Sequence, residues 1–413
     1  MSKFILIFSL CVLSTSFASE VDSFTNRQQV LNQRDATEEI SAKINWYIDL
    51  VVRRFNKKNN CSVKPASKLY KLTDSARSCL GGHWRNQCKG EITLYRWLKY
   101  RKYGGYFDRS QLHPKKSVYR DFKFTKSPSL TLVSTFHNTM GVTVNLQGHL
   151  IGTDKFSHFF NRGRKYWKNY YGYGKNAKKI TRNYANDPLA ASLAREKYML
   201  AMGKYSEESL FGAKSTGVAS YGDLAANFAG LRFWNDFTGL ENDIITGRPV
   251  SEPYIKCVGT SFVINKKVDI KQYLNVAWDE GQNCSVYQTR KMALQVQRRV
   301  SNLPASESLH CPINIEKLRT AKDYYGKFYA EVVKEIPYQG LPKGIKSPKP
   351  FHFYKTFEIN EANATSETTT IFHDISDDDE DEDEDEDEDD FFFDGVSDSE
   401  ASDDFDEYDI LDF

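Results

Sequence analysis

The sequence predicts a mainly α-helical fold with a small antiparallel β-hairpin or sheet, an α+β arrangement linked by disulfide bonds and followed by a disordered acidic C-terminal tail. Apolar residues recur at helical spacing in several long segments, and a Leu-, Val- and Thr-rich pattern typical of strands is confined to one region. Six cysteines follow the first 18 residues. Charge is segregated: 24 of the 55 acidic residues follow residue 373, which leaves 31 acids against all 56 bases before it.

The N-terminus has the pattern of a secretory signal peptide, which predicts a secreted or periplasmic protein. Lys3 precedes an apolar stretch, residues 4–13, and the small residues Ser16 and Ala18 occupy positions −3 and −1 of a cut after Ala18. No later apolar run approaches the roughly 20 residues that span a bilayer, so we expect no integral membrane span. The predicted parts are the signal peptide, residues 1–18, a basic, mainly helical body, residues 19–344, a linker, residues 345–373, and the acidic tail, residues 374–413.

The cysteine count predicts disulfide bonds, because an even number remains in a chain expected to enter an oxidising compartment. Of the six cysteines after the predicted signal peptide, three precede residue 100 and three follow residue 250, so complete pairing requires at least one bridge between the two ends of the body. A zinc site is the alternative, although no C-x-x-C pair is present. The connectivity stays open at this stage. The six are Cys61, Cys79, Cys88, Cys257, Cys284 and Cys311.

The helical elements are predicted from apolar spacing and from capping residues. Asp35-Ala-Thr-Glu38 is a capping-box variant that begins a helix running to about Lys57, and Ser220 opens another through Phe237. Residues 129–135 and 142–151 are rich in Leu, Val and Thr, with Gly141 between them, which predicts a β-hairpin. Further helices are predicted over residues 67–78, 91–100, 154–170, 188–207, 288–300 and 315–335.

Two of these helices each display a pair of polar groups on one face. Lys155 and His158 are three residues apart, Asp223 and Asn227 are four apart, and apolar residues surround the second helix on nearly every side. A buried Asp and Asn need partners, so we expect the two helices to pack together with these four groups in contact. Two interpretations remain open: a structural polar cluster, or a divalent-metal site for a hydrolase formed by Asp154, His158 and Asp223.

The motif Asp-Lys-x-x-His-Phe at residues 154–159, followed by Asp-Leu-Ala-Ala-Asn-x-x-Gly at residues 223–230, resembles a pattern shared by VanZ-like proteins and by small periplasmic proteins of unknown function. The resemblance covers residues 154–230 only. It implies residence in the cell envelope and an important polar pair, and it implies no reaction.

A second, looser resemblance concerns the segment that begins at Glu207-Glu208-Ser209 and ends at Ser215-Thr216-Gly217, which is similar to goose-type lysozymes and lytic transglycosylases. It implies that Glu208 is a catalytic acid of a peptidoglycan hydrolase, with a pKa raised by an apolar wall such as Phe211 and Tyr221. The alternative is an exposed acidic pair at a helix end.

Basic and aromatic residues alternate in residues 94–126 and 162–179, which favours binding of an anionic polymer or a glycan of the envelope. This binding is the leading function predicted, with the acidic tail competing for the same surface or docking a basic protein partner. Asp279 and Glu280 are adjacent, so their side chains point apart and are poorly placed to act on one bond. No nucleotide-binding motif is present, and no cofactor is predicted beyond the metal alternative. The predicted binding surface comprises Arg96, Trp97, Lys99, Arg101, Lys102, Arg162, Arg164 and Trp167.

Overall fold

The computed structural model describes residues 20–83, 87–121, 140–208, 212–213, 216–304, 310–337 and 339–341. These residues all belong to one unit, Ser16–Phe357. The predicted signal peptide, the linker, the acidic tail and the predicted strand at residues 129–135 lie outside the described residues.

The described part of the chain is mainly helical, as predicted. None of its helices combines the length and apolarity needed to cross a bilayer. The α-helices are α1 (Arg27–Leu31), α2 (Thr37–Asn56), α3 (Pro65–Leu80), α4 (Leu94–Lys99), α6 (Lys155–Ser157), α7 (Gly163–Tyr170), α8 (Lys175–Asn183), α9 (Pro188–Glu208), α10 (Tyr221–Thr238), α11 (Arg290–Ser301), α12 (Ile315–Arg319), α13 (Lys322–Tyr325) and α14 (Tyr329–Val332). Single turns of other helix types are η2 (Arg101–Tyr103), η3 (Pro114–Lys116), η4 (His158–Arg162), η5 (Ile270–Gln272), η6 (Val276–Trp278) and η8 (Gly326–Phe328).

The strands form three small sheets. The order in the first is β1-β2-β3, with both pairs antiparallel; in the second it is β4-β7-β8, where β7 and β8 are parallel; β5 and β6 form an antiparallel pair. Their bounds are β1 (Ser110–Gln111), β2 (Val142–Leu146), β3 (His149–Gly152), β4 (Val218–Ala219), β5 (Ile255–Val258), β6 (Ser261–Ile264), β7 (Val286–Tyr287) and β8 (Gln339–Gly340).

Two predicted elements were wrong in detail. Residues 142–151 were expected to be one strand of a hairpin, but they form a whole hairpin, β2 and β3. The turn lies at Gln147 and Gly148, which adopt φ of 53° and 73°. A tight two-residue turn needs this pair of left-handed conformations. The single helix predicted over residues 315–335 is broken into α12, α13, η8 and α14. Gly326, with φ of 51°, interrupts it.

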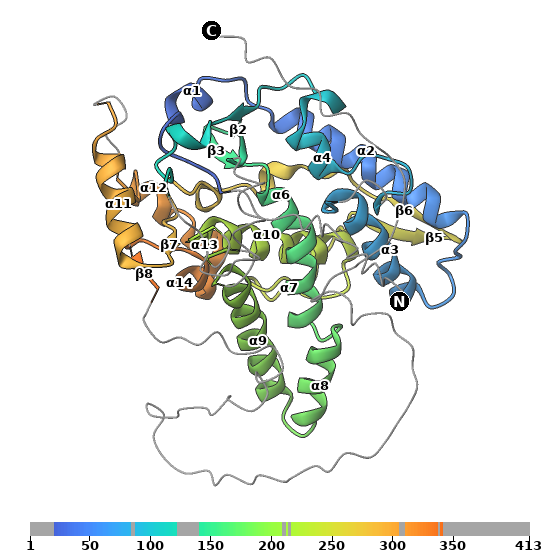
Figure 1. The fold of residues 1–413 in the computed structure, drawn as a ribbon. Helices are drawn as coiled ribbons and strands as arrows, with labels where there is room; N and C mark the ends of the chain where they lie inside the picture. Colours follow the sequence, from blue (N-terminus) through green and yellow to red (C-terminus); the bar gives the residue numbers. More distant parts are fainter. Residues whose placement is uncertain are drawn as a thin grey trace, which may run out of the picture. The chain divides into compact units, whose positions relative to one another are not determined.

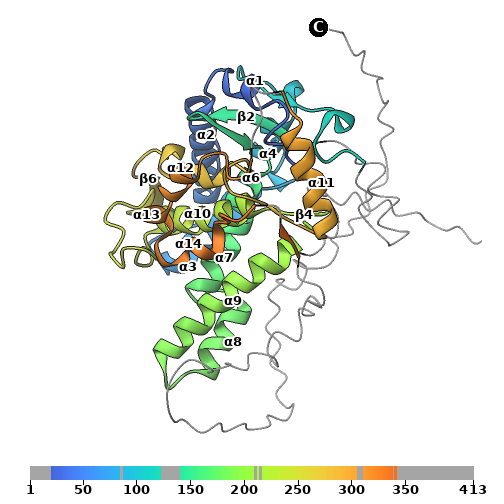
Figure 2. The ribbon, with the colours of Figure 1, turned by 90° about the vertical axis from the view of Figure 1, so that its left-hand side faces the viewer.

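Helix α10 lies among the other labelled elements in both views of the fold, against α6 and α7 (Figures 1 and 2). Ser220 caps its first turn by accepting a hydrogen bond from the main-chain nitrogen of Asp223, and Gly239, with φ of 62°, ends it. Nearly every residue between these caps is buried, so the prediction of a buried helix is confirmed. Trp234 also donates its indole N–H to the main-chain oxygen of Phe160 and so ties α10 to η4.

The main chains of α10 and the η4–α7 segment touch where two glycines face each other. A Cβ atom on Gly230 would lie 1.9 Å from the main-chain oxygen of Phe159, and one on Gly163 would lie 2.5 Å from Cα of Gly230. Neither position has room for a larger side chain. The close approach brings the polar residues one and two turns earlier on α10 within reach of the facing helix.

The six cysteines form three disulfide bonds, which confirms the disulfide prediction. Cys61 pairs with Cys257, Cys79 with Cys88, and Cys284 with Cys311. The first of these bridges spans 196 residues and is the predicted link between the two ends of the body.

Candidate functional site

The four polar groups predicted to meet are in contact in the structure. Nζ of Lys155 lies 2.7 Å from Oδ1 of Asp223, and Nε2 of His158 lies 3.3 Å from Oδ2 of the same carboxylate. Nδ1 of His158 lies 3.1 Å from the side-chain amide of Asn227. The expected packing of the two helices is therefore confirmed.

Local sequence explains why these groups face each other. Asp223, Asn227 and Gly230 are four and three residues apart and lie on one face of α10, with the glycine at the helix crossing. On the facing segment, η4 is a π-helical turn that begins at His158, directly after α6. Such wide turns inside a helix occur frequently at functional sites, because they re-aim a side chain out of the regular register.

Lys155 is the centre of one half of the cluster. Its ammonium lies 3.2 Å from Asp154, 2.7 Å from Asp223 and 2.5 Å from Glu280. The hydroxyl of Ser220 donates a hydrogen bond of 2.9 Å to Oε1 of Glu280. The side chains of Lys155, Asp223 and Glu280 are at most 6% exposed, and that of Asp154 is 15% exposed. Three carboxylates therefore share one buried ammonium.

His158 is the centre of the other half. Oε1 of Glu207, at the end of α9, lies 3.8 Å from Nδ1 of His158. When the amide of Asn227 is oriented with its NH₂ group towards the ring, it donates to Nδ1 and to the main-chain oxygens of His158 and Asp223. Nδ1 is then an acceptor, which leaves the ring proton on Nε2, facing Asp223.

Burial and like charges shift the acidity of the whole cluster. Burial, reinforced by neighbouring carboxylates, raises the pKa of Glu280 to about 7, that of Asp223 to about 6 and that of Glu207 well above its usual value. Burial lowers the pKa of His158 to about 3, so its imidazole is neutral. Burial alone would lower the pKa of Lys155, but the charges of Asp154, Asp223 and Glu280 raise it well above its usual range.

A fifth carboxyl group, that of Glu20, acts on the same cluster. Burial and the charges of Glu280 and Asp223 raise its pKa well above the usual value, and Thr216 gives it a hydrogen bond. Glu20, Asp154, Glu207, Asp223 and Glu280 thus share one ammonium and a neutral imidazole. Because five carboxyl groups share one ammonium and a neutral imidazole, several of them retain a proton at a pH where a free carboxyl group is ionised.

Sequence reasoning missed Glu20, Glu207 and Glu280. The side chains of Asp279 and Glu280 do point apart, as expected of adjacent residues, but each reaches a buried cation: Asp279 reaches Arg27 at 2.6 Å and Glu280 reaches Lys155. The two carboxylates therefore do not meet, but Glu280 alone joins the cluster through Lys155. The one local signal available for Glu207 was its position beside Glu208 at the end of a helix.

The glutamate favoured by the lysozyme resemblance is in neither group of potential metal ligands among the described residues. Glu208 is half-buried at the last position of α9, where burial raises its pKa and the charge of Lys204 opposes the shift. Residues 209–211, including the proposed wall residue Phe211, lie outside the described residues. Its buried neighbour Glu207 is the glutamate that reaches the cluster.

The predicted basic aromatic surface is only partly at the surface. Trp97, Trp167 and Arg164 are 6%, 0% and 2% exposed, so including them was wrong. Trp97 packs against Phe107, and Arg164 forms a 2.7 Å ion pair with Asp74. Their burial has a simple cause: the aromatic rings on these amphipathic segments fill the core rather than face solvent.

The rest of that predicted set is exposed or half-buried. Arg101 and Lys102 are exposed, and Arg96, Lys99 and Arg162 are half-buried. The guanidinium of Arg96 lies 5.4 Å and 5.6 Å from the ring centres of Tyr100 and Tyr103, distances typical of cation–π contacts. A smaller basic aromatic patch therefore remains at α4 and η2.

Two groups of side chains in the described part of the chain have the ligand types and proximity to hold a metal ion, and they share Asp223. One consists of His158, Glu207 and Asp223, and the other of Asp154, Asp223 and Glu280, with the ligand atoms of each within 4.8 Å of one another. The ammonium of Lys155 already lies among the carboxylates of the second group. Asp154 thus belongs with Lys155, and Glu207 completes the group that contains His158.

Unsatisfied oxygens mark the same place. Oε1 of Glu207 and Oε2 of Glu280 are buried and accept no hydrogen bond from any described residue. A buried acceptor without a partner costs free energy, on the order of 1–3 kcal/mol. The cluster is therefore short of donors or cations.

No protein-family model, curated protein or solved structure matches this chain.

Proposed function

We propose that this protein is a metal-dependent hydrolase that acts outside the cytoplasm and binds a divalent cation through His158, Glu207 and Asp223. The observation that carries the proposal is the convergence of these three ligand atoms within 4.8 Å, in a buried cluster that contains more carboxylates than cations.

The donor set suits a divalent metal. One imidazole nitrogen with two carboxylate oxygens is a common combination for Zn²⁺, Mn²⁺ or Fe²⁺. The imidazole is already neutral, as ligation requires. The cation would replace the proton on Nε2 of His158, and Asn227 could then rotate its amide so that its oxygen accepts from Nδ1–H, an arrangement that fixes the ring.

The second half of the cluster provides charge and proton transfer. A divalent cation here would supply Lewis-acid chemistry at a carbonyl or phosphoryl oxygen. Lys155 holds Asp223 from the opposite side and adds a fixed positive charge. Glu280 exchanges its proton close to neutral pH and is held by Ser220, which suits it to general acid–base catalysis.

Two observations favour a location outside the cytoplasm. Three disulfide bonds fit an oxidising compartment, and the N-terminal sequence pattern fits secretion. We therefore place the proposed substrate in the cell envelope or beyond it.

The direct test is metal binding by the full, disulfide-bonded chain. Purified protein is dialysed against Zn²⁺ or Mn²⁺ and bound metal is counted by mass spectrometry, with E207Q beside E208Q as a matched control on the neighbouring residue. We expect one ion per chain for the unsubstituted protein and for E208Q, and a loss of at least tenfold in affinity for E207Q. Equal binding by both variants, or no binding at all, would overturn the cation site.

Activity is tested on the same proteins with p-nitrophenyl acetate, p-nitrophenyl phosphate and bis-p-nitrophenyl phosphate. Hydrolysis that depends on added metal and falls at least 100-fold in E207Q but not in E208Q supports the proposal. A loss in E208Q alone would instead favour a glycan hydrolase that uses Glu208, and intact cell-wall sacculi are the substrate for that arm.

A second candidate, binding of an anionic polymer or glycan, is supported by the patch at α4 and η2. Arg101 and Lys102 are exposed there beside Arg96, which lies over two tyrosine rings. Charge reversal of Arg101 and Lys102 should abolish salt-sensitive retention on a polyanion column. Unchanged retention would remove this candidate.

A further inference from the structure

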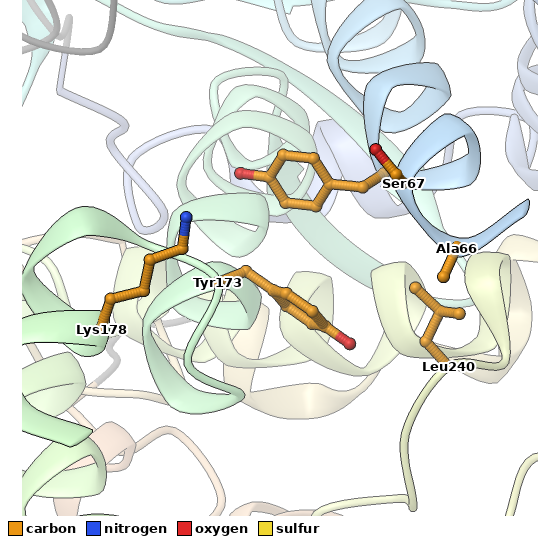
Figure 3. A pocket seen from close by; sticks show the side chains of 6 residues that line it. Ala66, Ser67, Tyr173, Lys178 and Leu240 are labelled. Carbon is orange, nitrogen blue, oxygen red and sulfur yellow. The ribbon is translucent and has the colours of Figure 1, made fainter. Parts of the chain in front are cut away.

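A pocket of about 210 Å³ shares no lining residue with the carboxylate cluster and is built from three separate segments (Figure 3). Helix α3 contributes one wall, the segment from Tyr173 into α8 contributes the second, and the residue two after α10 contributes the third. The lining residues are Ala66, Ser67, Tyr70, Tyr173, Lys178 and Leu240.

The aromatic walls are held rigidly from behind. Trp167, which is wholly buried, stacks on Tyr70 at 5.9 Å with an angle of 27° and lies 5.0 Å from Tyr173 at 33°. The Tyr173 hydroxyl donates a hydrogen bond of 2.5 Å to Glu241, which fixes the direction of its ring. Two half-buried tyrosines are therefore set in place before any ligand arrives, and little conformational entropy is lost on binding.

The polar groups of the pocket are few and lie near its edge. Figure 3 shows the side chain of Lys178 directed towards the space beside Tyr173, with the Ser67 hydroxyl on the other side. Lys178 is exposed and forms no ion pair with any described residue. A concave site with aromatic walls, one cation and one hydroxyl suits a small ligand with an apolar face, hydroxyl groups and one negative charge.

The surrounding charge favours an anion. Residues 163–186 contain seven basic residues and no acid, and residues 64–71 of the α3 wall contain three lysines and no acid. Two acids near the pocket already have partners: Glu241 accepts the Tyr173 hydroxyl, and Asp74, one turn after Tyr70 on α3, pairs with Arg164. Such a field attracts acidic polymers and is screened by salt.

We propose that this pocket binds one acidic sugar unit, a uronic acid, of an anionic glycan. The C–H face of the sugar ring packs on Tyr173 and Tyr70, its carboxylate pairs with Lys178, and a ring hydroxyl reaches Ser67. The site is independent of the proposed cation site, because it shares no residue with the carboxylate cluster.

The experiment measures binding of trigalacturonic acid to the full chain by quenching of tryptophan fluorescence, for which Trp167 behind the tyrosines is the reporter. Maltotriose is the control for charge, because it is a neutral trisaccharide. Galacturonic acid, the monomer, tests whether the pocket binds a free acidic sugar as well as it binds a unit of a polymer. K178Q is compared with K197Q, an exposed lysine on α9 that changes the charge equally outside the pocket. E207Q is included to separate this site from the cation site.

We expect trigalacturonic acid to bind saturably and maltotriose to bind at least tenfold more weakly. The affinity for trigalacturonic acid should fall tenfold in K178Q and change less than twofold in K197Q and in E207Q. Binding of the monomer as tightly as the trimer would assign the pocket to a free acidic sugar and overturn the polymer part. Equal losses of affinity in K178Q and K197Q would show that the net charge of the protein, and not a contact of Lys178, causes the binding, and would overturn the site. An absence of binding up to about 10 mM trigalacturonic acid would also overturn it.

Discussion

Two adjacent acidic residues, Asp279 and Glu280, are both buried, but their pKa values are shifted in opposite directions. Asp279 forms a paired contact with Arg27, with Oδ1 2.9 Å and Oδ2 2.6 Å from the guanidinium nitrogens, and it also accepts from the main-chain nitrogens of Gly281 and Leu150. Burial alone would raise its pKa, but the charge and hydrogen bonds of Arg27 lower it. This carboxylate is balanced and fully hydrogen-bonded.

Glu280 competes with Asp154 and Asp223 for one ammonium, and its pKa is raised to about 7. A balanced buried pair stabilises or orients the fold, whereas an unbalanced cluster costs stability and is kept for what it does. The comparison therefore contrasts a balanced pair, Arg27 with Asp279, with the cluster around Lys155 that we propose to be functional.

The largest effect is expected from breaking the balanced pair. R27A leaves the carboxylate of Asp279 buried without its cation, which should lower the free energy of unfolding by about 3–5 kcal/mol in urea at pH 7. The matched control is R53A, whose ion pair with Asp49 is 64% and 47% exposed and should contribute less than about 1 kcal/mol. Similar losses in the two variants would remove the distinction.

The next effect comes from supplying the cation that the unbalanced cluster lacks. At a concentration of Zn²⁺ one hundred times its dissociation constant, the unsubstituted protein should gain about 2.7 kcal/mol in unfolding free energy. Calorimetry should show the same gain in R27A and at most about 1.4 kcal/mol in E207Q, because its affinity should be at least tenfold lower. An undiminished gain in E207Q would locate the metal elsewhere.

The pH dependence of stability should distinguish the two acids. Between pH 4.5 and about 7, folded Glu280 keeps a proton that the unfolded chain has released, so its contribution to stability falls as pH rises through this window. Asp279 has a lowered pKa, so its contribution is present above pH 3.8 and is lost only as pH falls below that value. In metal-free buffer, the unfolding free energy of E280Q relative to that of the unsubstituted protein should rise by on the order of 2 kcal/mol from pH 5 to pH 8. A difference that stays flat over this range would contradict the assignment.

The smallest effect is expected for D154N. Asp154 is the most exposed carboxylate around Lys155, which keeps Asp223 and Glu280 when Asp154 loses its charge. The change in unfolding free energy should stay below about 1 kcal/mol. A loss as large as that of R27A would show that Lys155 needs all three carboxylates and that the cluster is a balanced structural contact after all.

The helices were predictable from the sequence because their cause is local. Apolar periodicity and caps located α2, α3, α9, α10 and α11 to within a few residues. The burial of α10 followed from apolar residues on all its sides, and the meeting of Lys155 and His158 with Asp223 and Asn227 followed from the need of buried polar groups for partners. The odd number of cysteines on each side of the body required one bridge between its two ends, and the structure shows that this bridge is Cys61–Cys257.

The composition of the cluster depended on the tertiary structure. Glu20, Glu207 and Glu280 come from segments far apart in the chain, and no spacing rule connects them to Lys155. The same is true of Trp97 and Trp167, whose side chains suit a binding surface and a core equally well until packing decides between them. Apolar periodicity in the sequence predicts which face of a helix or strand turns inward. Which side chains that face meets depends on contacts between segments far apart in the chain. Those contacts set the charge balance and the pKa of every acid in the cluster.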